Sequence, residues 1–196
     1  FYPEGEDESR NFLKQYEEMV RHELSDHDED EYVKLARRTI EYYVRYGKRL
    51  KERGNLPEGM MNKAGTFVSI HKFDRLRGCI GTILPREEDI VEEIISNAIS
   101  ACSADPRFDR VEESELPYLK ISVDVLSEPE DIDDKSMLDP ERYGVIVSYK
   151  HKKGLLLPDL DGVDTIDQQI DIARRKADIS ERDPYTLQRF EVIRHE

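Results

Sequence analysis

The segment Leu76-Arg77-Gly78-Cys79-Ile80-Gly81-Thr82 holds the residues of this chain that are best suited to chemistry. Two glycines flank a cysteine in a stretch that otherwise has the pattern of a strand, and glycine within a strand often marks a bulge or a close approach to the backbone. Side chains two positions apart in a strand point to the same face, so we expect Arg77 and Cys79 to share one. A neighbouring guanidinium favours thiolate over thiol. The segment therefore predicts a cysteine nucleophile or covalent carrier that Arg77 activates.

These residues also allow other interpretations. Cys79 could be a small buried residue that fits between Gly78 and Gly81. Arg77 could bind a carboxylate or a phosphate, with the two glycines giving that anion access to backbone N–H groups, or it could form an ion pair. A general base for Cys79 is not evident, because a Cys–His pair would need His71.

A predicted hairpin must position this segment, with strands at residues 66–71 and 75–83 and a turn at 72–74. Pairing Ile70 with Leu76 puts the apolar side chains on one face, where they would meet the core: Val68, Ile70, Leu76 and Ile80. The same register puts Ser69, His71, Arg77 and Cys79 on the other face, and a slip of one residue would mix the two sets. Ser69 is therefore a candidate binding residue beside Cys79.

A second motif, Asp105-Pro106-Arg107-Phe108, ends a helix predicted at residues 87–104, since proline cannot continue a helix. Because this helix follows the hairpin directly, Asp105, Arg107 and Phe108 could line the same site. Alternatively, the motif caps the helix and fixes the following loop.

The order of the remaining elements indicates an internal repeat. Apolar periodicity predicts further helices at 8–24, 31–53 and 166–177 and strands at 119–126, 145–149, 155–157 and 187–194, with a loop at 128–142. Each unit has a strand, a turn, a strand, a helix and a strand, and the second unit has no cysteine at the matching place. Asp164 or Thr165 can cap the helix of that unit, with Gln168 completing a capping box. We expect an α+β fold with a largely antiparallel sheet and flanking helices, built from two diverged ββαβ-type repeats.

Composition excludes several classes of function. The chain has 196 residues and a net charge of −14, of which the first 31 residues carry −9, so phosphate-mediated binding of nucleic acid is not expected. Two cysteines make no disulfide framework, and the five histidines have no metal-ligand spacing, so we expect no metal site. The chain has neither a phosphate loop nor a dinucleotide fingerprint, so we expect no cofactor. The absence of a long apolar run or a secretory pattern favours a cytoplasmic protein that does not span a membrane.

The sequence resembles the AMMECR domain family, the A component of the so-called AmmeMemoRadiSam system. The resemblance covers about residues 32–196, which predicts an AMMECR-type domain at residues 31–196. It rests on several motifs, of which the heptapeptide at 76–82 is the most specific. The others are Tyr32-Val33-Lys34-Leu35-Ala36-Arg37, Phe67-Val68, Asp105-Pro106-Arg107-Phe108, Glu115-Leu116-Pro117 and Leu156-Leu157-Pro158.

The resemblance implies an α+β fold with a cleft and two companion proteins. One companion is similar to radical S-adenosylmethionine (SAM) enzymes and the other to extradiol dioxygenases. Some members are fused to the dioxygenase-like protein, so residues 1–30 are interpreted as an acidic linker or helix left from such a fusion. The family commonly has lysine where His71 stands, which argues against His71 as an essential base. Asp178 replaces a usual glycine near the end, which affects only a helix cap.

Two hypotheses follow. In the first, the protein is a cysteine-dependent enzyme acting on a small molecule or peptide in the companions' pathway, with Cys79 as nucleophile or carrier and Arg77 as its activator. In the second, it is a non-catalytic module that binds a substrate or a protein in the same cleft, which explains why no base is evident. We favour the first, because it explains a cysteine rather than an alanine or valine between the glycines.

Overall fold

The structure is a computed structural model and describes residues 29–51 and 56–196. Its helices are α2 (Glu31–Tyr46), α3 (Ile90–Ser103) and α4 (Ile166–Lys176), with 3-10 helices η1 (Glu58–Met61), η2 (Glu113–Tyr118) and η3 (Lys135–Met137). Its strands are β1 (Thr66–Lys72), β2 (Arg75–Gly81), β3 (Leu119–Leu126), β4 (Glu130–Ile132), β5 (Tyr143–Tyr149), β6 (Lys152–Leu156) and β7 (Thr186–His195). The helix predicted at residues 8–24 lies outside the described residues.

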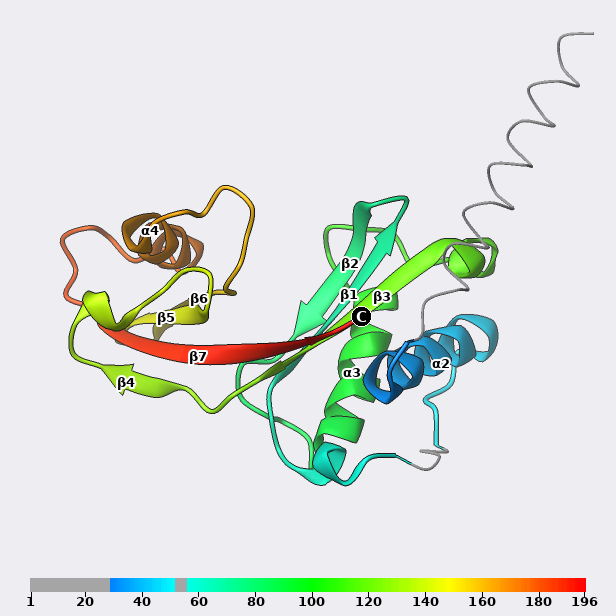
Figure 1. The fold of residues 1–196 in the computed structure, drawn as a ribbon. Coiled ribbons are helices and arrows are strands. Elements are labelled where there is room, and N and C mark those ends of the chain that lie inside the picture. Colours follow the sequence, from blue (N-terminus) through cyan, green and yellow to red (C-terminus); the bar gives the residue numbers. More distant parts are fainter. Residues whose placement is uncertain (1–28, 52–55) are drawn as a thin grey trace, which may run out of the picture.

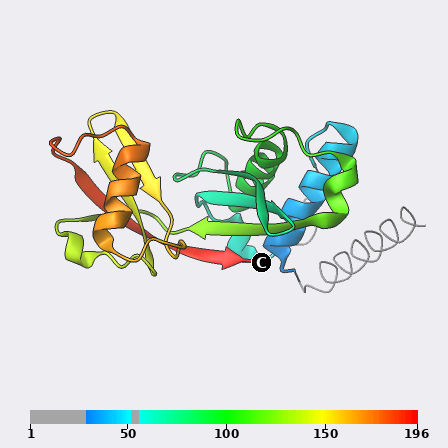
Figure 2. The same ribbon diagram turned by 90° about the horizontal axis from the view of Figure 1, so that it is seen from above.

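The strands form one antiparallel sheet with the order β2-β1-β3-β7-β5-β6, and β4 pairs with β7. Figure 1 shows α3 below β1–β3 and α4 above β5 and β6, with β7 running between the two halves. Figure 2 shows the halves side by side, with α2 and α3 in the first and α4 in the second. The predicted α+β class and antiparallel sheet are therefore confirmed.

The predicted repeat is visible in the strand order. In the first half β3 pairs with β1 of the hairpin β1–β2, and in the second half β7 pairs with β5 of the hairpin β5–β6. A glycine occupies the same position in both halves. A Cβ atom on Gly78 would lie 2.3 Å from the Ala101 carbonyl oxygen of α3, and a Cβ atom on Gly154 would lie 1.9 Å from the Ala173 carbonyl oxygen of α4. Both strands therefore pack closely against the backbone of their helix.

Each half has a hydrophobic core between its sheet and its helix. In the first half, Val68, Ile70 and Val123 pack with α3 and α2, and in the second half Val145 and Val147 pack with α4. A third apolar cluster contains residues of both halves, among them Leu126, Ile146, Leu155 and Phe190. Burial of apolar surface in the first two clusters stabilises each half, and burial in the third, which has residues from both, holds the halves together.

The sheet face opposite the helices differs between the halves. In the first half, Ser69 of β1 lies directly opposite Cys79 of β2 and Ser122 of β3. At the matching positions of the second half, Ile146 and Leu155 are paired and belong to the third apolar cluster. The second half thus buries this face, whereas the first half has polar side chains on it.

The predicted register of the first hairpin is wrong. Ile70 pairs with Gly78, not with Leu76, and a bulge between Ile70 and His71 makes Leu76 the partner of His71. A bulge adds a residue to one strand and changes which way the following side chains point. Leu76 therefore joins His71 on the side away from the core and is 39% exposed.

Two other expectations need correction. The helix predicted at 31–53 ends at Tyr46, because Gly47 adopts a left-handed conformation (φ 64°) and its N–H donates to the Tyr43 carbonyl. The region at 128–142, predicted as a loop, contains the short strand β4 and η3. Three residues give too little alternation for a strand to be recognised from sequence.

Candidate functional site

A groove of about 560 Å³ lies over the polar sheet face of the first half. Its first-half lining comes from the two hairpin strands and from β3: Ser69, His71, Asp74, Leu76, Cys79, Lys120, Ser122 and Asp124. The loop after β6 and the end of β7 supply the rest: Leu157, Asp159, Leu160, Asp161, Arg194 and Glu196. Both halves of the molecule therefore build this groove, which corresponds to the expected cleft.

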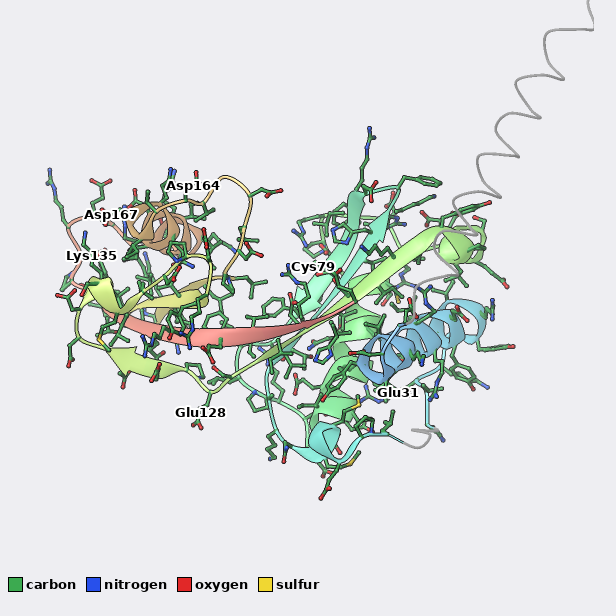
Figure 3. The ribbon with its side chains drawn as sticks, viewed as in Figure 1. Glu31, Cys79, Glu128, Lys135, Asp164 and Asp167 are labelled. Atoms are coloured by element: carbon green, nitrogen blue, oxygen red, sulfur yellow. The ribbon has the colours of Figure 1, made fainter. Side chains whose placement is uncertain are left out.

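Cys79 is half-buried on the groove wall. Figure 3 shows it on the side of the first half that faces the second. The Ser69 hydroxyl donates a hydrogen bond to Cys79 Sγ across a distance of 3.2 Å, because the two residues are direct partners in the β1–β2 register. The structure thus brings together two of the predicted site residues in the groove.

Asp105 and Arg107 hold the backbone of Cys79 from outside the sheet. β2 is an edge strand, so its outer N–H and C=O groups have no partner strand. The Asp105 carboxylate accepts the Cys79 N–H at 2.9 Å, and Arg107 Nη2 donates to the Cys79 carbonyl at 3.1 Å. The two side chains also form an ion pair with a shortest distance of 2.8 Å. We call Asp105 and Arg107 the clamp on β2.

The clamp is strongly charged although half of it is buried. The Asp105 side chain is 1% exposed and that of Arg107 is 54% exposed. Hydrogen bonds from the Arg107 side chain, together with those from the backbone N–H groups of Cys79 and Arg107, hold the pKa of Asp105 well below its usual range despite its burial. The pKa of Arg107 is raised, mainly by its hydrogen bonds to the Asp105 carboxylate. A permanent ion pair therefore lies against Cys79.

Arg77 does not occupy the position predicted for it. Its Nε and Nη2 bind the two carboxylate oxygens of Glu115 at 3.1 and 2.9 Å, and the Asp109 and Arg110 carbonyls accept from Nη1 and Nη2 at 2.7 and 3.1 Å. Because the bulge leaves Arg77 outside the pairing register, its side chain turns to η2 and the loop before it rather than to the groove. The cation beside Cys79 is Arg107.

Lys72 also donates to the Glu115 carboxylate, at 2.9 Å. Burial alone would raise the pKa of Glu115, but the hydrogen bonds from Arg77, the Glu112 N–H and Lys72 outweigh it and lower the pKa to about 2. This ion-pair network fixes the tip of the β1–β2 hairpin to η2. The role of Arg77 in this structure is therefore to hold the hairpin in place.

The two glycines also differ from expectation, because neither lines the groove. Gly78 faces α3, as described above. A Cβ atom on Gly81 would lie 2.2 Å from the ring of Phe67. Both glycines therefore permit close packing, and neither offers its backbone to an anion. Phe108 does not line the groove either, since its ring lies 5.4 Å from the Arg107 guanidinium on the clamp side.

Among the residues that the structure describes, some charged side chains in the groove form ion pairs and others do not. Arg194 Nε donates to the buried carboxylate of Asp124 at 2.9 Å, and Lys120 lies 3.9 Å from Glu196. Within residues 29–51 and 56–196, by contrast, no ion pair neutralises Asp74, Asp159 or Asp161. The groove therefore carries more negative than positive charge.

Sequence reasoning missed most of the groove. Lys120, Ser122 and Asp124 form the polar side of a strand that the alternation predicts correctly, and this was the available signal. Their link to Cys79 depends on the β1–β3 register, and Asp159 and Asp161 come from the other half of the molecule. Neither relationship can be inferred from local spacing.

Cys102 makes a useful contrast with Cys79. It is buried in α3, and burial raises the pKa of its thiol to about 12. Across the described ranges there is no group of three or more His, Cys, Asp or Glu side chains placed to hold a metal ion. None of the helices in those ranges is both long enough and apolar enough to cross a membrane.

Comparison with known proteins agrees with the fold. The family model AMMECR1 matches residues 33–195. A Thermotoga maritima protein is 49% identical over 170 residues, which is 85% of this chain and 98% of the relative. Protein CA_C1420 of Clostridium acetobutylicum is 47% identical over 187 residues, and the match spans 93% of this chain but only 40% of that longer protein.

A solved structure has the same architecture. The crystal structure of the uncharacterized protein PH0010 from Pyrococcus horikoshii superimposes with a TM-score of 0.77 at 29% identity, covering 83% of this chain and 88% of that one. Together with the family model and the relatives, this similarity leaves no ambiguity about descent. The chain belongs to the AMMECR1 family.

Proposed function

We propose that the groove binds a small molecule or a peptide and that Cys79 reacts with it as a nucleophile. The observation that carries the proposal is the position of the Cys79 thiol on the groove wall, with the Ser69 hydroxyl donating to it. In such a reaction sulfur attacks an electrophilic carbon and an S–C bond forms. The leaving group departs with the electrons of its broken bond, and the thiol proton passes to solvent.

The repeat supports this proposal. In the second half, the equivalent sheet face is apolar and buried, with Leu155 at the position of Cys79. The first half has hydroxyl, thiol and carboxylate groups on that face and an open groove above them. Because the fold itself does not require polar groups there, their presence is better explained by binding or chemistry.

The charge of the groove favours a ligand with a positively charged group. Asp74, Asp159 and Asp161 have no ion pair to satisfy them within the described part of the chain. A cationic group that enters the groove would gain from their field, and salt would weaken this attraction.

An ester with a good leaving group tests the proposed chemistry. Incubation with p-nitrophenyl acetate should release nitrophenolate and add one acetyl group to the peptide that contains Cys79. Cys79→Ser and Cys79→Ala should abolish this acetylation with unchanged unfolding curves, and Cys102→Ala should not affect it. Acetylation elsewhere in the native chain at the same rate, with none on Cys79, would contradict the proposal.

A binding module is the second candidate. It is favoured because, in the described ranges, Ser69 is the residue that hydrogen-bonds to Cys79 Sγ, and no histidine or carboxylate does so. A module of this kind should retain a cationic peptide in Cys79→Ala with unchanged affinity. It should lose affinity in Asp159→Asn and Asp161→Asn, whereas an enzyme should lose turnover in Cys79→Ala.

We keep the radical-SAM-like and dioxygenase-like proteins as the proposed companions of this domain. The Clostridium relative is much longer than this chain, which supports a setting with additional domains. Purification of the three proteins after co-expression tests this part of the proposal. A complex that dissociates when the groove is labelled on Cys79 would link the groove to the companions, and failure of the three to associate would remove the partners only.

A further inference from the structure

The clamp binds the outer N–H and C=O groups of Cys79, and it also bears on the chemistry of this residue. We infer that Asp105 and Arg107 are the positioning residues of Cys79: they fix its backbone from outside the sheet and hold a guanidinium against the same residue. This inference rests on the proposed function, because it assigns the groups that prepare Cys79 to react.

The contacts of the clamp converge on one residue of β2. The Asp105 carboxylate and Arg107 Nη2 bind the N–H and the C=O of Cys79 itself, at 2.9 and 3.1 Å. A neighbouring strand would normally satisfy those two groups. Side chains therefore do this at Cys79, and they leave the thiol directed toward the groove.

The clamp is itself rigidly built. The Asp105 carboxylate accepts from the Arg107 N–H at 3.1 Å, from Nε at 3.0 Å and from Nη2 at 2.8 Å. Pro106 lies between the two residues and restricts the backbone. A guanidinium held by two of its nitrogens on a buried carboxylate loses little further entropy when it acts on Cys79.

The two arginines can now be assigned separate tasks. Arg77 is engaged by Glu115 and two carbonyls, whereas the Arg107 side chain is 54% exposed and its Nη2 donates to the Cys79 carbonyl at 3.1 Å. A positive charge held against this residue favours negative charge on its sulfur. Arg107 therefore has the task that the sequence suggests for Arg77.

The rate of Cys79 alkylation by iodoacetamide as a function of pH tests the inference, with modified peptides resolved by mass spectrometry. Other titratable groups that line the groove with Cys79 stay unchanged in every variant: His71, Asp74, Lys120, Asp124, Asp159, Asp161, Arg194 and Glu196. In Arg107→Gln the rate of Cys79 alkylation at neutral pH should fall by about tenfold, because the positive charge held against the reacting residue is lost. Arg107→Lys should recover part of this loss.

Arg110→Gln is the matched control, since it removes a positive charge from the same loop but not from the clamp. Its profile should equal that of the unmodified protein. Asp105→Asn should slow the reaction as well, because the amide still accepts from Cys79 but no longer holds Arg107 by charge.

A second measurement begins with the unmodified protein, in which no substitution can affect folding, and is then repeated with the variants. Iodoacetate carries a negative charge and iodoacetamide does not, so Arg107 should favour iodoacetate relative to a free thiol, although the groove is acidic. The ratio of the two rates should fall as salt is added and should fall further in Arg107→Gln.

The outcomes separate the two proposals. If Cys79 reacts faster than a free thiol and Arg107→Gln matches Arg110→Gln in both profile and ratio, the clamp inference is wrong and the proposed function stands. If Cys79 reacts no faster than a free thiol in the unmodified protein, the clamp does not activate it and this inference is also overturned. Acetylation by p-nitrophenyl acetate then decides the proposed function independently.

Discussion

The Asp105 carboxylate accepts the hydrogen bond of the Cys79 N–H at 2.9 Å, which joins two residues 26 positions apart. Asp105 belongs to the loop that follows α3, and Cys79 belongs to the edge strand β2. The two most distinctive motifs of the sequence are therefore one structural unit. Four predictions test the packing, the charge and the asymmetry that this unit and its surroundings display.

The contact between Gly78 and α3 predicts that Gly78→Ala destabilises the protein. The new Cβ would lie 2.3 Å from the Ala101 carbonyl oxygen, and helix backbone cannot move away cheaply. Overpacking of this kind costs about 1–3 kcal/mol. Gly154→Ala should have a similar effect in the second half, where the distance is 1.9 Å. Urea unfolding measures both.

Gly59→Ala is the control for these substitutions. Its Cβ would have Tyr32 Oη as its nearest neighbour, at 3.7 Å, which is an ordinary contact. The free energy of unfolding should change by less than about 0.5 kcal/mol. Equal effects of Gly59→Ala and Gly78→Ala would show that strand–helix contact is not the cause.

The lowered pKa of Glu115 means that part of the stability of the protein should depend on pH. Its pKa is about 2 in the folded protein against an ordinary value of 4.5, so its contribution is complete above pH 4.5 and is lost as pH falls toward 2. The contribution is on the order of 3 kcal/mol, since one pH unit corresponds to about 1.4 kcal/mol. The destabilisation caused by Glu115→Gln should therefore be largest at neutral pH and should shrink below pH 4.5.

Glu196→Gln provides the comparison, because Glu196 is exposed and lies 3.9 Å from Lys120. Exposed pairs of this kind contribute about 0–1 kcal/mol. Unfolding curves between pH 2 and pH 7 should show little difference between this variant and the unmodified protein. A pH-independent effect of Glu115→Gln would argue against the ion-pair network at η2.

The start of α4 distinguishes two adjacent candidates for a helix cap. Thr165 is the N-cap: its hydroxyl accepts from the Gln168 N–H at 3.2 Å, and Gln168 Oε1 accepts from the Thr165 N–H at 3.0 Å. Thr165→Ala should cost about 1 kcal/mol of stability. Asp164→Ala keeps its backbone contact to Gln168 and should stay within about 0.5 kcal/mol. The opposite order in thermal unfolding would reject this cap.

The asymmetry of the two halves predicts that Cys79→Leu is tolerated by the fold but not by the function. Leucine is the residue at the matching position of the second half, Leu155, and the Cys79 side chain faces an open groove. Stability should change by less than about 1 kcal/mol, whereas reaction with p-nitrophenyl acetate should disappear. A large loss of stability would show instead that Cys79 is a packing residue.

Much of this fold can be predicted from sequence because alternation and helical periodicity are local. The strand at 119–126 and the helix that begins after Thr165 follow their apolar patterns closely, and the hairpin at 66–81 forms where it is predicted, although its register differs. The repeat can also be recognised from the sequence, since two similar series of elements follow each other in the same order. These features depend on neighbours in the chain, which a sequence displays directly.

The candidate site is less predictable because it depends on a bulge and on distant contacts. The bulge near Leu76 changes the direction of the Arg77 side chain, and no local sequence pattern predicts this bulge. The pairing of Cys79 with Asp105 and Arg107 requires the path of the chain around α3. The motifs identify the participants correctly, while their roles emerge only in three dimensions.

The accessibility of Cys79 in the native protein is the most direct test of the central claim. Labelling of the folded protein with N-ethylmaleimide at neutral pH, followed over time by mass spectrometry of its peptides, compares the groove thiol with buried Cys102. A thiol on the groove wall should be labelled rapidly and completely, so we expect this of Cys79, with Cys102 labelled only after unfolding. Equal protection of both thiols in the folded state would contradict it.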